Sequence, residues 1–150
     1  MITKKIISRF VLFVCLLLGA ANTVTDNVWA IEPYEIVTHP DVGDKTISRS
    51  SLRAIFGMRL HAWPDGTAIK VFVMPDDAPL HIAFSKEKLN VFPYQLRAAW
   101  DRLVFSGTGQ APATVATAEE MLARVSTTPG AIGYLARHRI DGKVNVLQIK

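Results

Sequence analysis

The chain has 150 residues, a single cysteine and a formal net charge of +4 from 17 basic and 13 acidic side chains. Three of the basic and one of the acidic residues fall within the first 30 positions, which leaves a net charge of +2 for the remainder. So small a charge does not indicate a nucleic-acid partner. A lone cysteine, Cys15, also excludes a disulfide within the chain.

The first 30 residues are typical of an export signal. They open with three basic side chains: Lys4, Lys5 and Arg9. An apolar run over 10–18 follows, and it is shorter than the ~20 residues that a membrane-spanning helix needs. We expect a signal peptide over 1–30, cleaved near Ala30 or Ala20, with a retained anchor as the alternative. Residues 31–150 are then expected to form one periplasmic domain without stable membrane insertion.

Hydrophobic spacing and turn residues indicate strands that alternate with helices. Four segments are predicted as strands: 35–38, 69–74, 131–135 and 143–149. Four segments are predicted as helices: one capped by Ser48 or Ser50 and ended by Gly57, then 79–89, 93–105, and one that begins with a capping box at 117–120. Segment 41–48 is predicted as a polar loop and 63–66 as a turn. This alternation predicts an α/β domain with a mostly parallel sheet flanked by helices.

The helical segments also predict which side chains are buried. The apolar stripe of 79–89 consists of Leu80, Ala83 and Phe84. The apolar stripe of 93–105 consists of Leu96, Trp100, Leu103 and Val104. Trp63 and Trp100 are expected to anchor the core, because large aromatic side chains contribute the most buried area.

Three motifs, taken in order, resemble a known family. They are Leu52-Arg-Ala-Ile-Phe-Gly-Met58, Trp63-Pro-Asp-Gly66 and, after a strand, Pro129-Gly-Ala-Ile-Gly-Tyr-Leu135. Together they resemble the periplasmic phosphate-binding proteins of ABC importers, in particular the second lobe of that type 2 periplasmic-binding fold. The resemblance covers roughly Ile36 to Leu135. Because that family has two lobes and this chain is long enough for one, the resemblance implies a single-lobe relative.

The resemblance also implies where an anion would bind, and there the sequence departs from the family. In the family an Arg-x-Asp-x-Ser-Gly-Thr signature follows the strand and binds phosphate. Here Met74 stands at the Arg position and Asp76 at the Asp position, and the Ser-Gly-Thr positions hold Ala78, Pro79 and Leu80. Charge-assisted hydrogen bonds contribute roughly 1.5–3 kcal/mol each. The loss of several such bonds predicts that direct phosphate capture is lost.

The candidate ligand-binding residues are Asp76, Asp77, Ala78, His81 and Arg97. Asp76 and Asp77 either face a ligand groove or cap the helix that begins at Pro79, and their position favours capping. His81 either lines the groove or is a solvated helix residue, and we expect the solvated position.

Arg97 has two interpretations as well. It either forms an anion-binding patch with Arg102, Lys86 and Lys88 or lies on a solvated helix face, which the spacing of the charges favours. The four histidines show no metal-ligand spacing, and no nucleophile elbow or cysteine nucleophile is present after Cys15. We therefore expect no metal, no cofactor, no catalytic residue and no enzymatic activity.

Two hypotheses about function remain. The first is an exported solute-binding-like module for a small anionic solute, with a groove at the carboxyl ends of the strands. Closure over a ligand then needs a second lobe, supplied by a dimer or by a separate protein. The second is an envelope protein-interaction or assembly module, because the apolar replacements suit protein contact better than anion contact: Met74, Ala78, Pro79 and Leu80.

Overall fold

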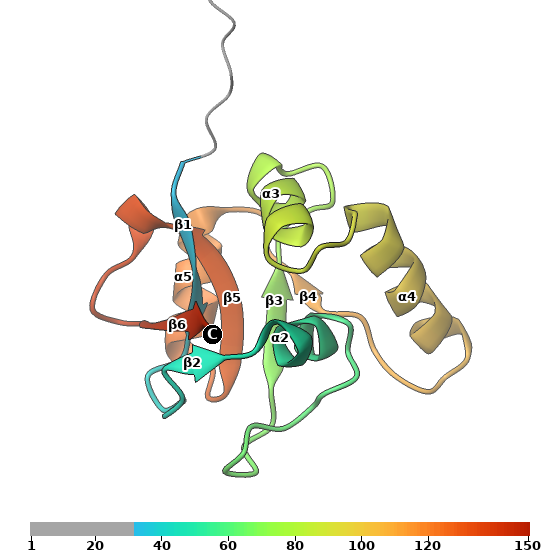
Figure 1. Ribbon diagram of the computed structural model, residues 1–150, viewed down its shortest axis with the longest axis horizontal. Coiled ribbons are helices and arrows are strands. Elements are labelled where there is room, and N and C mark those ends of the chain that lie inside the picture. The colour runs from blue at the N-terminus through green and yellow to red at the C-terminus, as the bar shows by residue number, and fades with distance from the viewer. Residues whose placement is uncertain (1–31) are drawn as a thin grey trace, which may run out of the picture. The chain divides into compact units, whose positions relative to one another are not determined.

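The computed structural model describes residues 32–150, so the expected signal peptide over 1–30 lies outside the described residues. The described strands are β1 (Tyr34–Thr38), β2 (Thr46–Ile47), β3 (Lys70–Val73), β4 (Ala113–Thr114), β5 (Ala131–Ala136) and β6 (Asn145–Ile149). The described helices are α2 (Arg49–Phe56), α3 (Pro79–Glu87), α4 (Pro93–Phe105) and α5 (Ala118–Thr127), with a 3₁₀ turn η1 (Arg137–Arg139) after β5. Figure 1 shows these elements along the chain.

The strands form one mixed sheet in the order β2-β6-β1-β5-β3-β4. Parallel pairs join β3 to β4, β3 to β5 and β2 to β6. The strand β1 runs antiparallel to both of its neighbours, β5 and β6. The predicted α/β class with a mostly parallel sheet is therefore confirmed, and the antiparallel pairs around β1 are an addition to it.

Helices cover the two faces of this sheet, and the alternation of side chains along β5 shows how. On one face, Gly133 leaves room for α5: a Cβ atom there would lie 2.5 Å from the sulfur of Met121. On the other face, the ring of Tyr134 stacks on Phe84 of α3 and lies beside Phe56 of α2, with centroids 4.2 and 6.2 Å apart. Successive residues of a strand point to opposite faces. In Figure 1, α5 accordingly lies behind the sheet, and α2 and α3 lie in front of it.

Local signals in the sequence fix the ends of two helices. The backbone N–H of Ser51 donates to the Ser48 hydroxyl at 3.0 Å, which makes Ser48 the N-cap of α2. The N–H of Glu120 donates to the Thr117 hydroxyl at 3.1 Å, and the Glu120 carboxylate accepts from the N–H of Ala116 at 2.9 Å. Both predicted caps are confirmed.

Two of the motifs that carry the family resemblance touch each other. The indole N–H of Trp63 donates to the carbonyl of Gly130 at 3.0 Å, and both residues are buried. Gly130 has a φ of +73°, and a Cβ atom there would lie 2.2 Å from the Ala68 carbonyl oxygen. The motif residues Trp63 and Gly130 therefore build the fold, since they allow the turn at Gly66 to dock against the start of β5.

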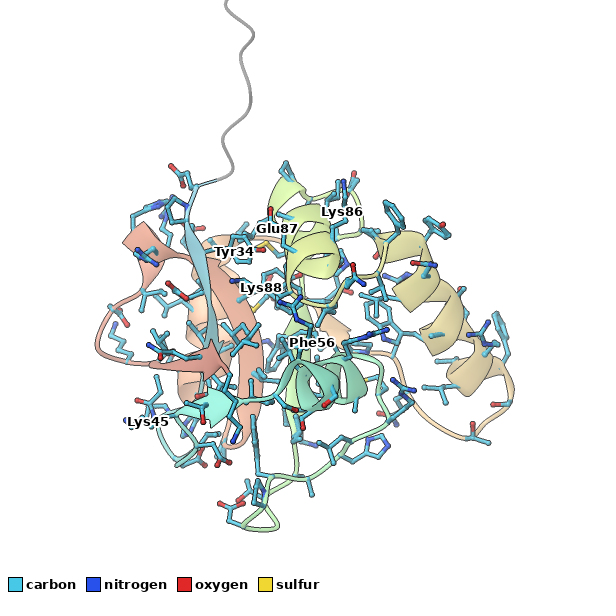
Figure 2. All side chains as sticks on the ribbon, in the orientation of Figure 1. Tyr34, Lys45, Phe56, Lys86, Glu87 and Lys88 are labelled. Carbon is cyan, nitrogen blue, oxygen red and sulfur yellow. The ribbon has the colours of Figure 1, made fainter. Side chains whose placement is uncertain are left out.

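A tyrosine links β1 to the front layer of helices. The Tyr34 hydroxyl donates to a carboxylate oxygen of Glu87, at the end of α3, at 2.7 Å. The ammonium group of Lys88 lies 5.3 Å from the centre of the Tyr34 ring. Figure 2 shows Tyr34, Glu87 and Lys88 together at this junction.

The structure corrects two predictions about the elements. The predicted loop over 41–48 is wrong for Thr46–Ile47, which pair with Gln148 and Ile149 of β6. A two-residue strand is too short to give a periodic signal. The predicted stripe of α4 is wrong for Val104, which is 48% exposed. The helix packs on α3 and is bonded through Trp100 to the end of α2, and only Leu96 and Trp100 on it are buried.

Candidate functional site

The candidate site lies where β3 leads into α3, at the carboxyl end of the strand. Its first component is an ion pair between Asp76, in this connection, and Arg97 of α4. The guanidinium donates twice to the carboxylate, through Nε to Oδ2 and through Nη2 to Oδ1, each at 2.9 Å. Such two-point pairing fixes the orientation of both groups. The guanidinium also lies over the ring of Trp100, 5.0 Å from its centre.

The second component is a buried hydrogen-bonded chain that ends at His81. The Tyr134 hydroxyl, from β5, accepts from the N–H of Met74 at 2.8 Å and lies 2.5 Å from Nδ1 of His81. His81 is fully buried, and its Nε2 lies 3.5 Å from the Ser85 hydroxyl and 4.0 Å from Oδ1 of Asp76. The sequence-based expectation that His81 is solvated is therefore wrong. The Tyr134 hydroxyl, 53 residues later in the chain, is the hydrogen-bond partner that offsets the cost of burying the His81 ring.

The surroundings of His81 and Tyr134 shift the pKa values of both groups. Burial lowers the pKa of His81, which the nearby Asp76 carboxylate opposes and Arg97 reinforces. Burial likewise raises the pKa of the Tyr134 hydroxyl, so it stays protonated at neutral pH. A neutral His81 carries one N–H, and every group is satisfied when the Tyr134 hydroxyl donates to Nδ1 and the His81 proton is on Nε2, on the side of Ser85 and Asp76. The hydrogen bonds from Arg97 hold the pKa of Asp76 below its usual value.

The first turn of α3 lacks the side-chain cap that the sequence suggested. Ala78 is the N-cap residue and makes no side-chain cap hydrogen bond, and Pro79 follows at the first helical position. The predicted capping by Asp76 or Asp77 is wrong, because Asp76 turns to Arg97 and Asp77 is exposed. The hydroxyls and the flexible glycine that the family resemblance implies for this turn are replaced by Ala78, Pro79 and the partly buried Leu80.

Both sequence interpretations of Arg97 also need correction. Arg97 is neither free in solvent nor part of a patch with the lysines, because its guanidinium is committed to Asp76. Lys88 lies over Tyr34, and Lys86 lies 5.7 Å from the ring centre of Phe92. The pair of Asp76 and Arg97 is separated by 21 residues, and no local spacing in the sequence could have shown it.

Two site residues were missed by sequence reasoning. Tyr134 lies inside the Pro129–Leu135 motif, where it was noted only as a strand residue. Trp100 was predicted as a core anchor, and its burial confirms that prediction, but its contact with Arg97 was not foreseen. Within residues 32–150, no group of three or more potential metal ligands converges. In the same part of the chain, no helix has the length and apolar character to cross a bilayer.

The comparisons with known proteins come from structure. No protein-family model and no curated protein matches the sequence. The fold is similar to an ABC-type phosphate transport receptor from Vibrio cholerae, with a TM-score of 0.59 and 14% identity over 79% of this chain and 46% of the receptor. It is also similar to PstS from Borrelia burgdorferi, with a TM-score of 0.60 and 16% identity over 79% of this chain and 47% of PstS.

At such low identity the likeness establishes the fold. This chain spans a little under half of the length of these structures, which is the relation expected for a single-lobe relative. The two fold-building contacts of the resemblance, at Trp63 and Gly130, are present, whereas the side chains at the implied anion positions differ. Residues 32–150 thus have the fold of phosphate-binding components of ABC transporters, in a form that corresponds to about half of such a protein.

Proposed function

We propose that residues 31–150 form an exported, periplasmic solute-binding-like module without enzymatic activity, in which direct phosphate capture at the start of α3 has been lost. The observation that carries the proposal is the two-point pairing of Arg97 with Asp76 at 2.9 Å. This guanidinium, which reaches the connection between β3 and α3, is held by a carboxylate of the same chain.

The other polar groups of this region support the same conclusion. The Met74 N–H and His81 are both bonded to the Tyr134 hydroxyl, so they are not directed at a ligand. Pro79 has no N–H, and Ala78 and Leu80 have no hydroxyl. An anion here would also meet the negative charge of Asp77, which is exposed and makes no ion pair with the described residues.

A solute of another kind remains compatible with this module. Its groove would lie at the carboxyl ends of β3, β4 and β5, where Asp76, Asp77 and the outer N–H groups of Arg97 reach the surface. A single lobe covers only one side of such a ligand, so we propose that a second copy or a separate protein supplies the other side.

Calorimetric titration with inorganic phosphate, paired with thermal unfolding, tests the loss of phosphate capture. We expect no heat of binding and no shift in melting temperature. A ligand at 100 times its Kd would add about 2.7 kcal/mol to the free energy of unfolding. A shift of that size that disappears in Arg97→Gln would contradict the proposal.

A gain-of-binding variant makes the test sharper. The triple substitution Ala78→Ser, Pro79→Gly, Leu80→Thr returns two hydroxyls and one N–H to the first turn of α3. If the missing donors are the reason for the lost site, phosphate should bind measurably to the triple variant and not to the parent chain. Equal responses of both proteins would show that these positions do not decide phosphate binding.

A second candidate function is favoured by the surface of α4 and the segment before it. Four large apolar side chains there are exposed: Phe92 by 49%, Tyr94 by 68%, Val104 by 48% and Phe105 by 87%. Aromatic residues are enriched in protein interfaces. The apolar residues at the start of α3 add no support of their own to this candidate, since Met74 is 6% exposed and Leu80 packs partly on the core.

We propose on this ground that α4 contacts an envelope protein if the module acts in assembly. Chemical cross-linking of the exported protein in intact envelopes, comparing the parent chain with Tyr94→Ser and Phe105→Ser, tests this candidate. A specific cross-linked partner should be lost in the two variants and kept in Val146→Ser, which alters an exposed apolar residue on β6. Cross-links that persist in all three variants would exclude α4 as the contact surface.

A further inference from the structure

Three arginines surround a cleft between the end of α2 and one side of α4. We call it the arginine cleft; its volume is about 270 Å³. Arg53 and Arg59 line it from the α2 side, and Arg102 lines it from α4 together with Gln95. Its apolar lining includes the partly buried Val91 and Leu96, which is 7% exposed. The cleft therefore combines cationic side chains with a buried apolar floor.

The two walls of the cleft are built by helical spacing and held in place by a buried bond. Gln95, Ala99 and Arg102 recur at intervals of four and three residues, so they share one face of α4. The indole N–H of Trp100 donates to the carbonyl of Phe56 at 2.8 Å and fastens α4 to the end of α2. Both side chains are fully buried, so the distance between the walls is fixed by core packing.

A glycine on the α2 side keeps this wall thin. A Cβ atom at Gly57 would lie 2.8 Å from the carbonyl oxygen of Arg53 and 3.5 Å from Nε of Arg59. A larger residue would therefore displace the backbone or the Arg59 side chain. The absence of a side chain at Gly57 leaves room for Arg59 to lie along the cleft.

The charges of the arginine cleft are not neutralised by the described part of the protein. Within residues 32–150, no hydrogen bond or ion pair joins the side chain of Arg53, Arg59 or Arg102 to another group. No residue that lines the cleft is acidic. Asp101, the neighbour of Arg102 in sequence, makes no ion pair or side-chain hydrogen bond with it among the described residues. Three cations that share a partly apolar hollow focus a positive potential on it.

We propose that the arginine cleft binds a small organic anion, with a carboxylate or phosphate head group against the guanidinium groups and a short apolar body against Val91 and Leu96. Guanidinium groups bind both head groups through paired N–H donors. The volume of about 270 Å³ lies just below the ~300–1,000 Å³ typical of small-molecule pockets, which suits a compact ligand. Ligand sites typically combine an apolar lining with a few polar groups that orient the ligand.

This site is separate from the start of α3. Position 97 is turned by about 200° around the helix from position 95, so Arg97 and the cleft residues lie on different sides of α4. Arg97 is bonded to Asp76, whereas Arg102 has no such partner among the described residues. The failure of one site to bind its ligand therefore says nothing about the other.

A titration followed by amide NMR spectra tests the proposal with hexanoate as the probe. Hexanoate should shift the amide signals of Gly57, Gln95 and Ala99 in a saturable manner. Two controls separate the contributions to binding: 1-hexanol has the apolar body without the charge, and inorganic phosphate has the charge without the body. Both should shift these signals much less. Equal effects of hexanoate and hexanol, or of hexanoate and inorganic phosphate, would overturn the proposed ligand class.

Variants identify the residues responsible. Arg53→Gln and Arg102→Gln should each weaken hexanoate binding about three- to tenfold, since each removes one charge at a partly solvated site. The matched control is Lys45→Gln, which removes one exposed charge beside β2, well away from α4 in Figure 2. It should leave the Kd unchanged. Equal weakening in all three variants would mean that hexanoate responds only to the net charge of the protein and would overturn the site, and so would unchanged binding in Arg53→Gln and Arg102→Gln.

Discussion

The start of α3 and the arginine cleft differ in whether their arginine side chains are paired with a partner among the described residues. At the start of α3, Asp76 and Arg97 are paired, and His81 and Tyr134 bond to each other. In the arginine cleft, Arg53, Arg59 and Arg102 have no side-chain partner among the described residues. Both regions lie against α4, which carries Arg97 on one side and Arg102 on another.

This difference distinguishes a structural polar network from a candidate binding surface. Polar groups that are hydrogen-bonded to one another contribute to stability and have few free donors or acceptors for a ligand. Cations left unpaired in a partly apolar hollow contribute little to stability and keep their donors available. We therefore expect substitutions at the start of α3 to change the free energy of unfolding, and substitutions in the cleft to change binding.

Replacement of Trp100 should have the largest effect, because this residue joins the two regions. Its indole N–H bonds to Phe56, and its ring lies under the Arg97 guanidinium. Trp100→Ala should lower the free energy of unfolding by about 3–5 kcal/mol through the lost burial and the resulting cavity. Urea denaturation measures this change.

Trp100→Phe is the matched control for that variant. It keeps most of the ring and leaves the buried Phe56 carbonyl without its donor, so the loss should be about 1–3 kcal/mol. A loss below ~1 kcal/mol in Trp100→Ala would mean that α4 is not anchored through this side chain.

Tyr134→Phe should have the next largest effect. The substitution keeps the stacking on Phe84 and removes the hydroxyl that serves both Met74 and His81. Two buried polar groups then lose their partner, and unfolding should become easier by about 1–3 kcal/mol. Chemical denaturation of Tyr94→Phe, at a 68% exposed tyrosine, provides the comparison and should show a change within ~0.5 kcal/mol. Similar losses in both variants would show that the network around Tyr134 contributes little.

Much of the fold could be predicted from sequence because its signals are local. The Ser48 cap, the Thr117–Glu120 box and the turn at Gly66 depend on residues within a few positions of one another. The motif over 129–135 resembles that of a known family, and the structure gives a role for two of its residues: Gly130 approaches Ala68, and Gly133 leaves room for α5.

The site could not be predicted in the same way, because its contacts are long-range. His81 bonds to a residue 53 positions away, and Asp76 bonds to one 21 positions away. Without those partners, a histidine in a first helical turn is expected in solvent and an aspartate before a helix is expected as a cap. The arginine cleft was missed for a related reason, since its walls come from two helices whose approach depends on the Trp100–Phe56 bond.

The pH dependence of stability tests the neutral state of His81. Burial lowers its pKa in the folded state below the ordinary value near 6.5. Above pH 6.5 the histidine is neutral in both states, and the full stability is present. As the pH falls below 6.5, His81 becomes protonated in the unfolded chain and stays neutral in the folded chain. The free energy of unfolding therefore declines until the pH reaches the lowered pKa of the folded state.

The slope from this one group is at most about 1.4 kcal/mol per pH unit. Denaturation midpoints measured between pH 7.5 and 5 for the parent chain and for His81→Gln isolate it, since the variant keeps a polar side chain but cannot titrate. We expect the decline to be smaller in the variant. Parallel curves for the two proteins would show that the pKa of His81 is the same in the folded and unfolded states. A parent chain that gains stability relative to the variant as the pH falls would indicate a protonated His81, held by Asp76 at 4.0 Å.

The smallest effects separate the paired arginine from the unpaired ones. A double-mutant cycle with Asp76→Asn and Arg97→Gln should give a coupling of about 0.2–1 kcal/mol, because the side chains of Asp76 and Arg97 are 37% and 38% exposed and solvent screens the attraction.

Arg59→Gln and Arg102→Gln should change stability by less than ~0.5 kcal/mol, and the direction should be towards a more stable protein, because each relieves repulsion between like charges. Thermal unfolding at low ionic strength, where this repulsion is least screened, is the most sensitive measurement. A clear destabilisation by Arg102→Gln would mean that its guanidinium has a structural partner, and the contrast between the two sides of α4 would then be lost.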